Sequence, residues 1–124
     1  MEVKIDTKEK FTVVTPFMPE LTAIIAAEIA ETCQEQLQKE VKNIILNLKS
    51  VSFLDEKAAE TLSELQQQFY ELNASFVICS LHPTVETFLE KIELLEMLNV
   101  TPTESEAWDI VQMEEIEREF LDGE

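Results

Sequence analysis

The fold of this chain follows from one stretch, Asn43-Ile44-Ile45-Leu46-Asn47-Leu48-Lys49-Ser50-Val51-Ser52-Phe53-Leu54-Asp55. Its apolar run is too short to span a membrane and ends in a carboxylate that directly precedes a helical pattern through Leu65, Phe69 and Leu72. Such a run predicts a buried strand over Asn43–Val51 that feeds a strand-to-helix turn. Because ligands and partners dock at such turns in open α/β sheets, we expect the functional surface there.

Two strands are predicted before this stretch. Val3 and Ile5 alternate with charged residues, and Phe11–Thr15 follows a polar connection, which indicates a hairpin or two adjacent strands. The segment Pro16-Phe17-Met18-Pro19 should stop the second strand, since proline cannot donate to a strand ladder. Pro19 also suits the first turn of a helix, so we expect a helix to begin at about Glu20.

Helical periodicity then dominates as far as about Glu40. The apolar residues recur at steps of three and four, which predicts an amphipathic surface helix whose inner face carries Leu21, Ile24, Ile25, Ile29, Cys33 and Leu37. A second helix is predicted directly after Asp55. Aspartate is a favoured N-cap residue, and Glu56 in the first turn complements the partial positive charge of a helix start.

The chain from Ser75 onward continues the alternation of strands and helices. Ser75–Cys79 predicts a buried strand, and Asn99–Pro102 predicts an edge strand or a turn. The helix between them should carry one apolar stripe of Val85, Phe88, Leu89, Ile92, Leu95 and Leu98. Thr103 and Glu106 have the spacing of a capping box before a fourth helix with apolar residues Ala107, Ile110, Val111, Met113, Ile116 and Phe120.

This alternation predicts the α/β fold class, with a mixed, mostly parallel sheet of four to five strands and about four helices. We expect a single domain over residues 1–124, with a frayed tail at 121–124.

The chain has 26 acidic and 9 basic residues, a formal net charge of −17, which disfavours nucleic acid and anionic membranes as partners. The same charge can also serve only to keep the protein in solution.

The sequence lacks the residue sets that catalytic and cofactor sites need. His82 is the only histidine, and its place before Pro83 is typical of a turn residue that bonds a backbone group. The single glycine, Gly123, cannot form a phosphate-binding loop. Cys33 and Cys79 are typical of small buried hydrophobic residues in a reducing compartment, and a disulfide between them stays an open alternative. We therefore expect no enzyme, no cofactor and no metal.

The charged N-terminus lacks a signal-peptide core, so we expect a cytoplasmic protein.

The unit Val41–Leu65 resembles the central motif of the STAS domain, the domain of bacterial anti-sigma factor antagonists and of the cytoplasmic tails of sulfate transporters. In that family an apolar strand ends in a turn such as Asp-Ser-Ser-Gly or Asp-Ser-Thr-Gly that caps a helix. The order of the other segments also resembles the family, down to Thr103 and the Glu106-Ala107 pair at the last helix start. The resemblance implies an STAS-like fold and a role in transcription regulation through protein binding.

The turn departs from the family pattern after its aspartate. Asp55 matches, but Glu56 stands at the first hydroxyl position, Lys57 at the hydroxyl residue that a partner kinase phosphorylates, and Ala58 at the glycine. The resemblance therefore implies no phosphoacceptor at Lys57. If the turn contacts a partner, that partner should offer Lys57 an acidic surface or a cluster of carbonyls. The alternative is that Lys57 is a solvated helix residue without a partner.

The leading hypothesis is a non-enzymatic regulatory module that binds a protein through Asp55, Glu56, Lys57 and Ala58 and through the neighbouring loop Pro16–Leu21, with Phe17 and Met18. The resemblance implies an anti-sigma factor as partner, a serine kinase of the histidine-kinase-like ATPase type. The alternative is a scaffold subunit that forms homo-oligomers through an apolar helix face such as Val85–Leu98. A small-ligand-binding domain is a third alternative, for which the sequence supplies no phosphate cradle.

Overall fold

The computed structural model describes residues 2–122. Its strands are β1 (Val3–Thr7), β2 (Thr12–Pro16), β3 (Glu20–Leu21), β4 (Ile44–Asn47), β5 (Phe53–Leu54), β6 (Phe76–Cys79) and β7 (Val100–Thr101). Its helices are α1 (Ala23–Gln36), α2 (Glu56–Glu71), α3 (Pro83–Lys91), the 3-10 turn η1 (Leu95–Met97) and α4 (Glu104–Asp122). None of the helices in this described part is long and apolar enough to cross a membrane.

Five strands form one sheet in the order β1-β2-β4-β6-β7. Only β1 runs antiparallel to its neighbour, because it forms the predicted hairpin with β2, and the pairs from β2 to β7 are parallel. The predicted α/β fold with a mixed, mostly parallel sheet is therefore confirmed. Two short strands, β3 and β5, pair with each other in a separate parallel ribbon.

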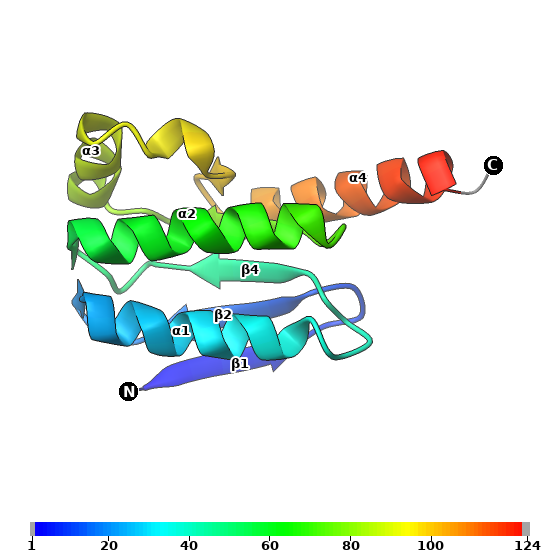
Figure 1. Cartoon of the computed structure of the whole chain (residues 1–124), viewed down its shortest axis with the longest axis horizontal. Helices are drawn as coiled ribbons and strands as arrows, with labels where there is room; N and C mark the ends of the chain where they lie inside the picture. Colours follow the sequence, from blue (N-terminus) through cyan, green and yellow to red (C-terminus); the bar gives the residue numbers. More distant parts are fainter. Residues whose placement is uncertain (1, 123–124) are drawn as a thin grey trace.

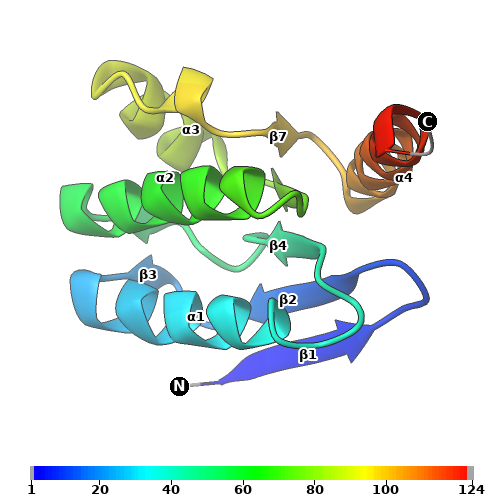
Figure 2. The same ribbon diagram turned by 45° about the vertical axis from the view of Figure 1, so that its right-hand side comes forward.

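Helices cover both faces of the sheet. Figures 1 and 2 show α1 and α2 side by side on one face and α4 on the other. The central strands are apolar on both sides for this reason: Ile44 and Leu46 pack toward α1 and α2, whereas Ile45 and Val77 pack toward Ala107 and Val111 of α4. This two-sided burial explains why β4 and β6 read as continuous apolar runs.

The first helix begins later than its periodicity predicts. Glu20 and Leu21 are not helical, because they pair in register with Phe53 and Leu54 as the β3–β5 ribbon. The prediction that Pro19 opens a helix is therefore wrong, and α1 starts only at Ala23 and ends at Gln36, short of Glu40. Tertiary hydrogen bonding to a distant segment overrides the local helical pattern here.

The strand predicted over Asn43–Val51 is shorter and leads to Asp55 indirectly. Strand β4 ends at Asn47, whose side-chain oxygen accepts a hydrogen bond from the amide of Lys49 at 3.0 Å. Asparagine that bonds the backbone two residues ahead turns the chain. The prediction of one continuous buried strand is therefore wrong: the chain leaves the main sheet at Asn47 and reaches the helix through the β3–β5 ribbon.

The third predicted helix is also interrupted. Helix α3 ends at Lys91, and Glu93 adopts a left-handed conformation with φ of 62° just after the helix. The stripe predicted over Val85–Leu98 is therefore divided between α3, η1 and the segment after it. Val85, Leu89 and Leu98 are buried in the core, so these residues are not free to bind another copy.

The end of the chain confirms the edge strand and the fourth helix, with one correction. The amide of Glu106 donates to the hydroxyl of Thr103 as predicted, but the Glu106 carboxylate accepts from that hydroxyl and does not return to the backbone. Helix α4 extends to Asp122, and fraying of the tail 121–124 stays a prediction. The rest of that predicted tail, 123–124, lies outside the described residues.

Candidate functional site

Asp55 holds two helix starts together. One carboxylate oxygen accepts a hydrogen bond from the amide of Ala58 at 2.8 Å, which confirms the predicted N-cap of α2. The other oxygen accepts from the amide of Ala23, the first residue of α1, at 3.2 Å. Thr22 precedes α1 but makes no side-chain cap, so Asp55 supplies the cap across 32 residues of sequence. With both oxygens engaged, Asp55 positions the site and is poorly placed to bind a partner itself.

The loop before α1 lies against the turn that contains Asp55. The carbonyl of Pro19 accepts hydrogen bonds from the amides of Ser52 and Phe53, at 2.9 and 3.1 Å, and the amide of Asp55 donates to the carbonyl of Leu21. The two segments that the sequence nominated are thus joined by backbone hydrogen bonds. They form one end of the molecule, at the carboxyl edge of the parallel strands (Figure 1).

The predicted site residues differ in accessibility. The side chain of Lys57 is 76% exposed and lies 3.8 Å from the Glu60 carboxylate, a loose surface ion pair. Glu56 and Phe17 are exposed and Met18 is half-buried. Ala58 is fully buried, so it supports the turn from inside and offers nothing to a partner.

Two exposed apolar residues at this end were missed by sequence reasoning. Ile24, which follows the amide that Asp55 caps, is 76% exposed, although the helical pattern placed it on the inner face. Phe53 is 52% exposed, although it was read as part of the buried strand. The first was missed because the buried face of α1 is formed by Ala26, Ile29 and Cys33, and at about 100° per residue Ile24 lies on the other side of the helix. The second was missed because a strand of two residues has too few positions to show an alternation. We name Phe17, Met18, Ile24, Phe53, Glu56 and Lys57 the Asp55 surface; Met18 is half-buried and the other five are exposed.

The connection leading to Phe53 is braced by α3. His82 Nε2 lies 3.1 Å from the carbonyl oxygen of Lys49, and the Thr84 hydroxyl donates to the carbonyl of Ser52 at 2.9 Å. The prediction that His82 is a turn residue bonded to a backbone group is confirmed. These contacts fix the ribbon from the side opposite to Pro19.

The reactive side chains lie away from this surface. Cys33 and Cys79 are free and buried, in separate clusters on opposite faces of the sheet. Burial raises the pKa of the Cys33 thiol to about 12 and that of Cys79 to about 11, which keeps both protonated. Among residues 2–122, no three histidine, cysteine or acidic side chains are placed to hold a metal ion. The Asp55 surface itself offers exposed apolar side chains and two opposite charges, those of Glu56 and Lys57.

The comparisons agree with this architecture. The family model of the STAS domain matches residues 2–107. A candidate anti-sigma factor antagonist from Thermotoga maritima superposes with a TM-score of 0.79, at 21% identity over 89% of this chain and 94% of its own. An anti-sigma-factor antagonist (STAS) domain protein from Planctomyces limnophilus gives a TM-score of 0.75, at 20% identity over 89% and 97%.

A third solved structure is the anti-sigma factor antagonist SpoIIAA in its unphosphorylated form. It superposes with a TM-score of 0.71, at 19% identity over 90% of this chain and 96% of that chain. At identities this low, the likeness establishes the shared fold.

Proposed function

This chain belongs to the STAS domain family, and from that premise we propose that it is a regulatory module that binds another protein through the Asp55 surface without catalysing a reaction. The observation that carries the proposal is that Phe17, Ile24 and Phe53 are exposed on segments that the hydrogen bonds of Pro19, Leu21 and Asp55 hold together at the start of α2. Apolar side chains of this size cost free energy in water, and a partner that covers them recovers it.

The partner class follows from the resemblance to anti-sigma factor antagonists. We propose an anti-sigma factor of the kinase-like ATPase type, bound in the cytoplasm. Neither Glu56 nor Lys57 carries a hydroxyl, so a kinase cannot switch this turn as it switches a serine. Binding at this site is then constitutive, and Lys57 presents a positive charge where a phosphorylated relative would present a negative one.

The test is capture of partners from an extract of the source organism, with the wild type and two single variants. Phe53→Asp places a charge within the Asp55 surface, whereas Met97→Asp also replaces an apolar residue by aspartate, at a position of similar exposure in η1. We expect the wild type and Met97→Asp to retain a kinase-like ATPase and Phe53→Asp to lose it.

A second pair isolates the contribution of Lys57. Lys57→Glu reverses the charge at the start of α2, and Lys39→Glu reverses an exposed charge beyond the end of α1, near the opposite edge of the sheet. Weaker retention by Lys57→Glu alone supports an acidic contact on the partner. Equal retention by both removes Lys57 from the interface, and retention of no ATPase by the wild type overturns the proposed partner class.

A further inference from the structure

The second half of α4 presents apolar residues to solvent. Met113, Ile116 and Phe120 are 57%, 65% and 79% exposed, whereas Ala107 and Val111 on the same helix are fully buried. At about 100° of rotation per residue, the three exposed positions share one face that points away from the sheet. Figure 1 shows this half of the helix projecting past the body of the molecule. We name Met113, Ile116 and Phe120 the α4 stripe.

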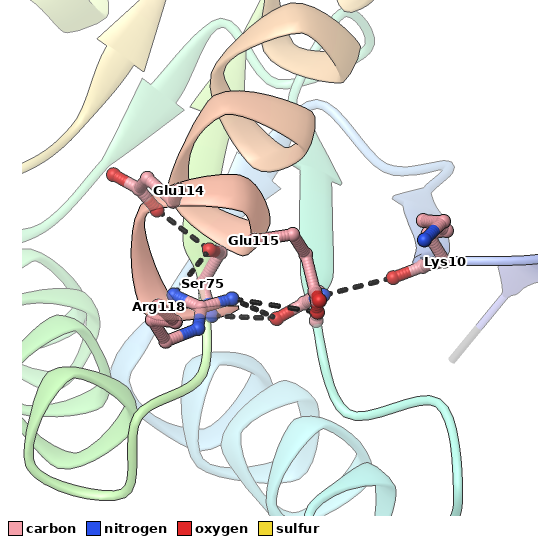
Figure 3. Close-up of polar contacts among 6 residues, drawn as sticks. Lys10, Ser75, Glu114, Glu115 and Arg118 are labelled. Carbon is pink, nitrogen blue, oxygen red and sulfur yellow. Dashed lines mark hydrogen bonds and ion pairs between the residues drawn. The ribbon is translucent and has the colours of Figure 1, made fainter. Parts of the chain in front are cut away.

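The inner side of the same half is polar and hydrogen-bonded (Figure 3). Arg118 donates to the Ser75 hydroxyl at 3.1 Å and to the Asn43 side-chain oxygen at 3.2 Å, and the Ser75 hydroxyl donates to Glu114 at 2.6 Å. Glu115 accepts from the Asn43 amide at 2.7 Å. These contacts anchor the helix to the starts of β4 and β6 through polar groups.

This arrangement reverses the usual pattern of a surface helix, which buries its apolar side and exposes its polar side. Folding of the single chain does not account for the α4 stripe, because more than half of each of its side chains is exposed and the helix is held by other residues. The polar anchor also fixes the helix before any partner arrives, and a surface that is already ordered loses less entropy on binding.

Charge indicates the kind of occupant. On the described part of α4, the exposed charged residues beside the stripe are Asp109, Glu117 and Glu119, and all are acidic. Arg118, the only arginine of the chain, is turned inward, with its side chain 23% exposed. A second copy would bring acidic helices together in a protein of net charge −17, whereas a basic segment would neutralise them.

A groove beside the stripe can receive an anchoring side chain. It has a volume of about 460 Å³ between α4 and the connection from β1 to β2, and Phe11, Trp108 and Ile116 form its apolar lining. The rings of Phe11 and Trp108 lie 5.1 Å apart. Its rim carries three glutamates and two lysines, one of which, Lys8, is paired with Asp6 at 3.0 Å. Such a groove next to an apolar stripe suits an amphipathic helix.

We propose that the α4 stripe and its groove dock a basic amphipathic helical segment of another protein. The inference is independent of the function proposed above. In Figure 1 the stripe lies toward the C-terminal end of the long axis, and the Asp55 surface lies at the other end. The STAS match also stops at residue 107, before the first residue of the stripe.

The experiment uses the whole protein and a synthetic leucine–lysine peptide of about four helical turns, patterned as a basic amphipathic helix. Trp108 is the only tryptophan and lines the groove, so its fluorescence reports binding. We expect a saturable blue shift with the wild type. Replacement of Met113, Ile116 and Phe120 by serine together should weaken binding by about tenfold or more, since central apolar contacts dominate such interfaces.

A matched control replaces three exposed apolar residues elsewhere, Ile5, Leu72 and Met97, by serine. Both triple variants should keep the wild-type circular dichroism, and the control should bind the peptide as the wild type does. Equal weakening by both variants, or equal binding of a scrambled peptide of the same composition, overturns the proposal in favour of general charge attraction. A dimer in sedimentation that only the stripe variant abolishes overturns it in favour of a second copy.

Discussion

The carboxylate of Asp55 decides where two helices begin relative to each other. Its two oxygens accept hydrogen bonds from Ala58 in α2 and Ala23 in α1. Because Thr22 provides no side-chain cap, loss of Asp55 leaves both helix starts without this partner. The apolar and charged side chains of the Asp55 surface extend from these two helix starts and from the ribbon between them.

Replacement of Asp55 by alanine should therefore lower the free energy of unfolding by about 2 kcal/mol, the upper range for one lost cap, since two amides lose an acceptor. Asp55→Asn should cost less, because its amide oxygen replaces one acceptor and its NH₂ group cannot replace the other. Urea unfolding of the three proteins gives the ranking. A variant Asp55→Ala as stable as the wild type would show that water satisfies both helix starts.

The two thiols are free and buried. Burial raises the pKa of Cys79 to about 11 and that of Cys33 to about 12. At pH 8 the more acidic of the two is then about one thousandth ionised, which leaves little thiolate to react.

We expect a thiol-specific disulfide reagent at pH 8 to label neither cysteine in the folded protein and both in denaturant. The pH dependence of stability has a defined sign: thiols of the unfolded chain ionise above about pH 8.5, whereas the folded thiols stay protonated up to about pH 11. The contribution of the protonated thiols to the free energy of unfolding is thus fully present below about pH 8.5 and is lost as the pH rises toward about 11. Labelling of the folded protein within seconds would contradict this account.

At the scale of elements, α4 is attached in two different ways. Its first half packs Ala107 and Val111 against β4 and β6, and its second half is held by the polar cluster around Asn43 and Arg118. Asn43 is nearly fully buried and bonds Lys10, Ser75, Glu115 and Arg118, so it links the β1–β2 connection, two strand starts and the helix.

Replacement of Asn43 by alanine should lower the free energy of unfolding by about 2 kcal/mol or more, because buried partners lose their hydrogen bonds. Hydrogen exchange should quicken in the second half of α4 and less in its first half. Gln67→Ala is the control, since the Gln67 amide bonds Glu71 on the exposed side of α2 and its loss should cost less than about 0.5 kcal/mol. Uniform exchange along α4 in both variants would argue against the polar anchor.

At the scale of the whole molecule, the net charge affects both the stability of the fold and the kind of partner that can bind. Two candidate interaction surfaces lie toward opposite ends of the long axis, in a chain of net charge −17. Self-repulsion on this scale destabilises the compact state and is screened by salt over about 10 Å at 0.1 M. It also favours a basic partner over a second copy at the α4 stripe.

Thermal stability should therefore rise with ionic strength. We expect the midpoint of thermal unfolding to increase by a few degrees between about 10 mM and 300 mM NaCl, as like charges are screened. KCl should act equally, since screening does not depend on which monovalent cation is added. A midpoint that falls with salt would indicate that favourable ion pairs outweigh the repulsion.

The sequence by itself determined the fold class and the N-cap of α2. The apolar runs of β4 and β6 predict central strands because both their faces are covered, and Asp55 before Glu56 predicts a helix start because the cap acts over three residues. Local patterns of this kind are carried by residues close together in the chain, so they can be read without coordinates.

Only the tertiary structure decided which apolar residues face water. The β3–β5 ribbon joins residues 33 positions apart and has two residues in each strand, so no local pattern predicts it, yet it delays the start of α1 and contains the exposed Phe53. Periodicity likewise placed Met113, Ile116 and Phe120 on a helix without showing which side of that helix the sheet covers. Which side of a helix is buried depends on segments far away in the sequence, and the sequence of the helix alone does not contain that information.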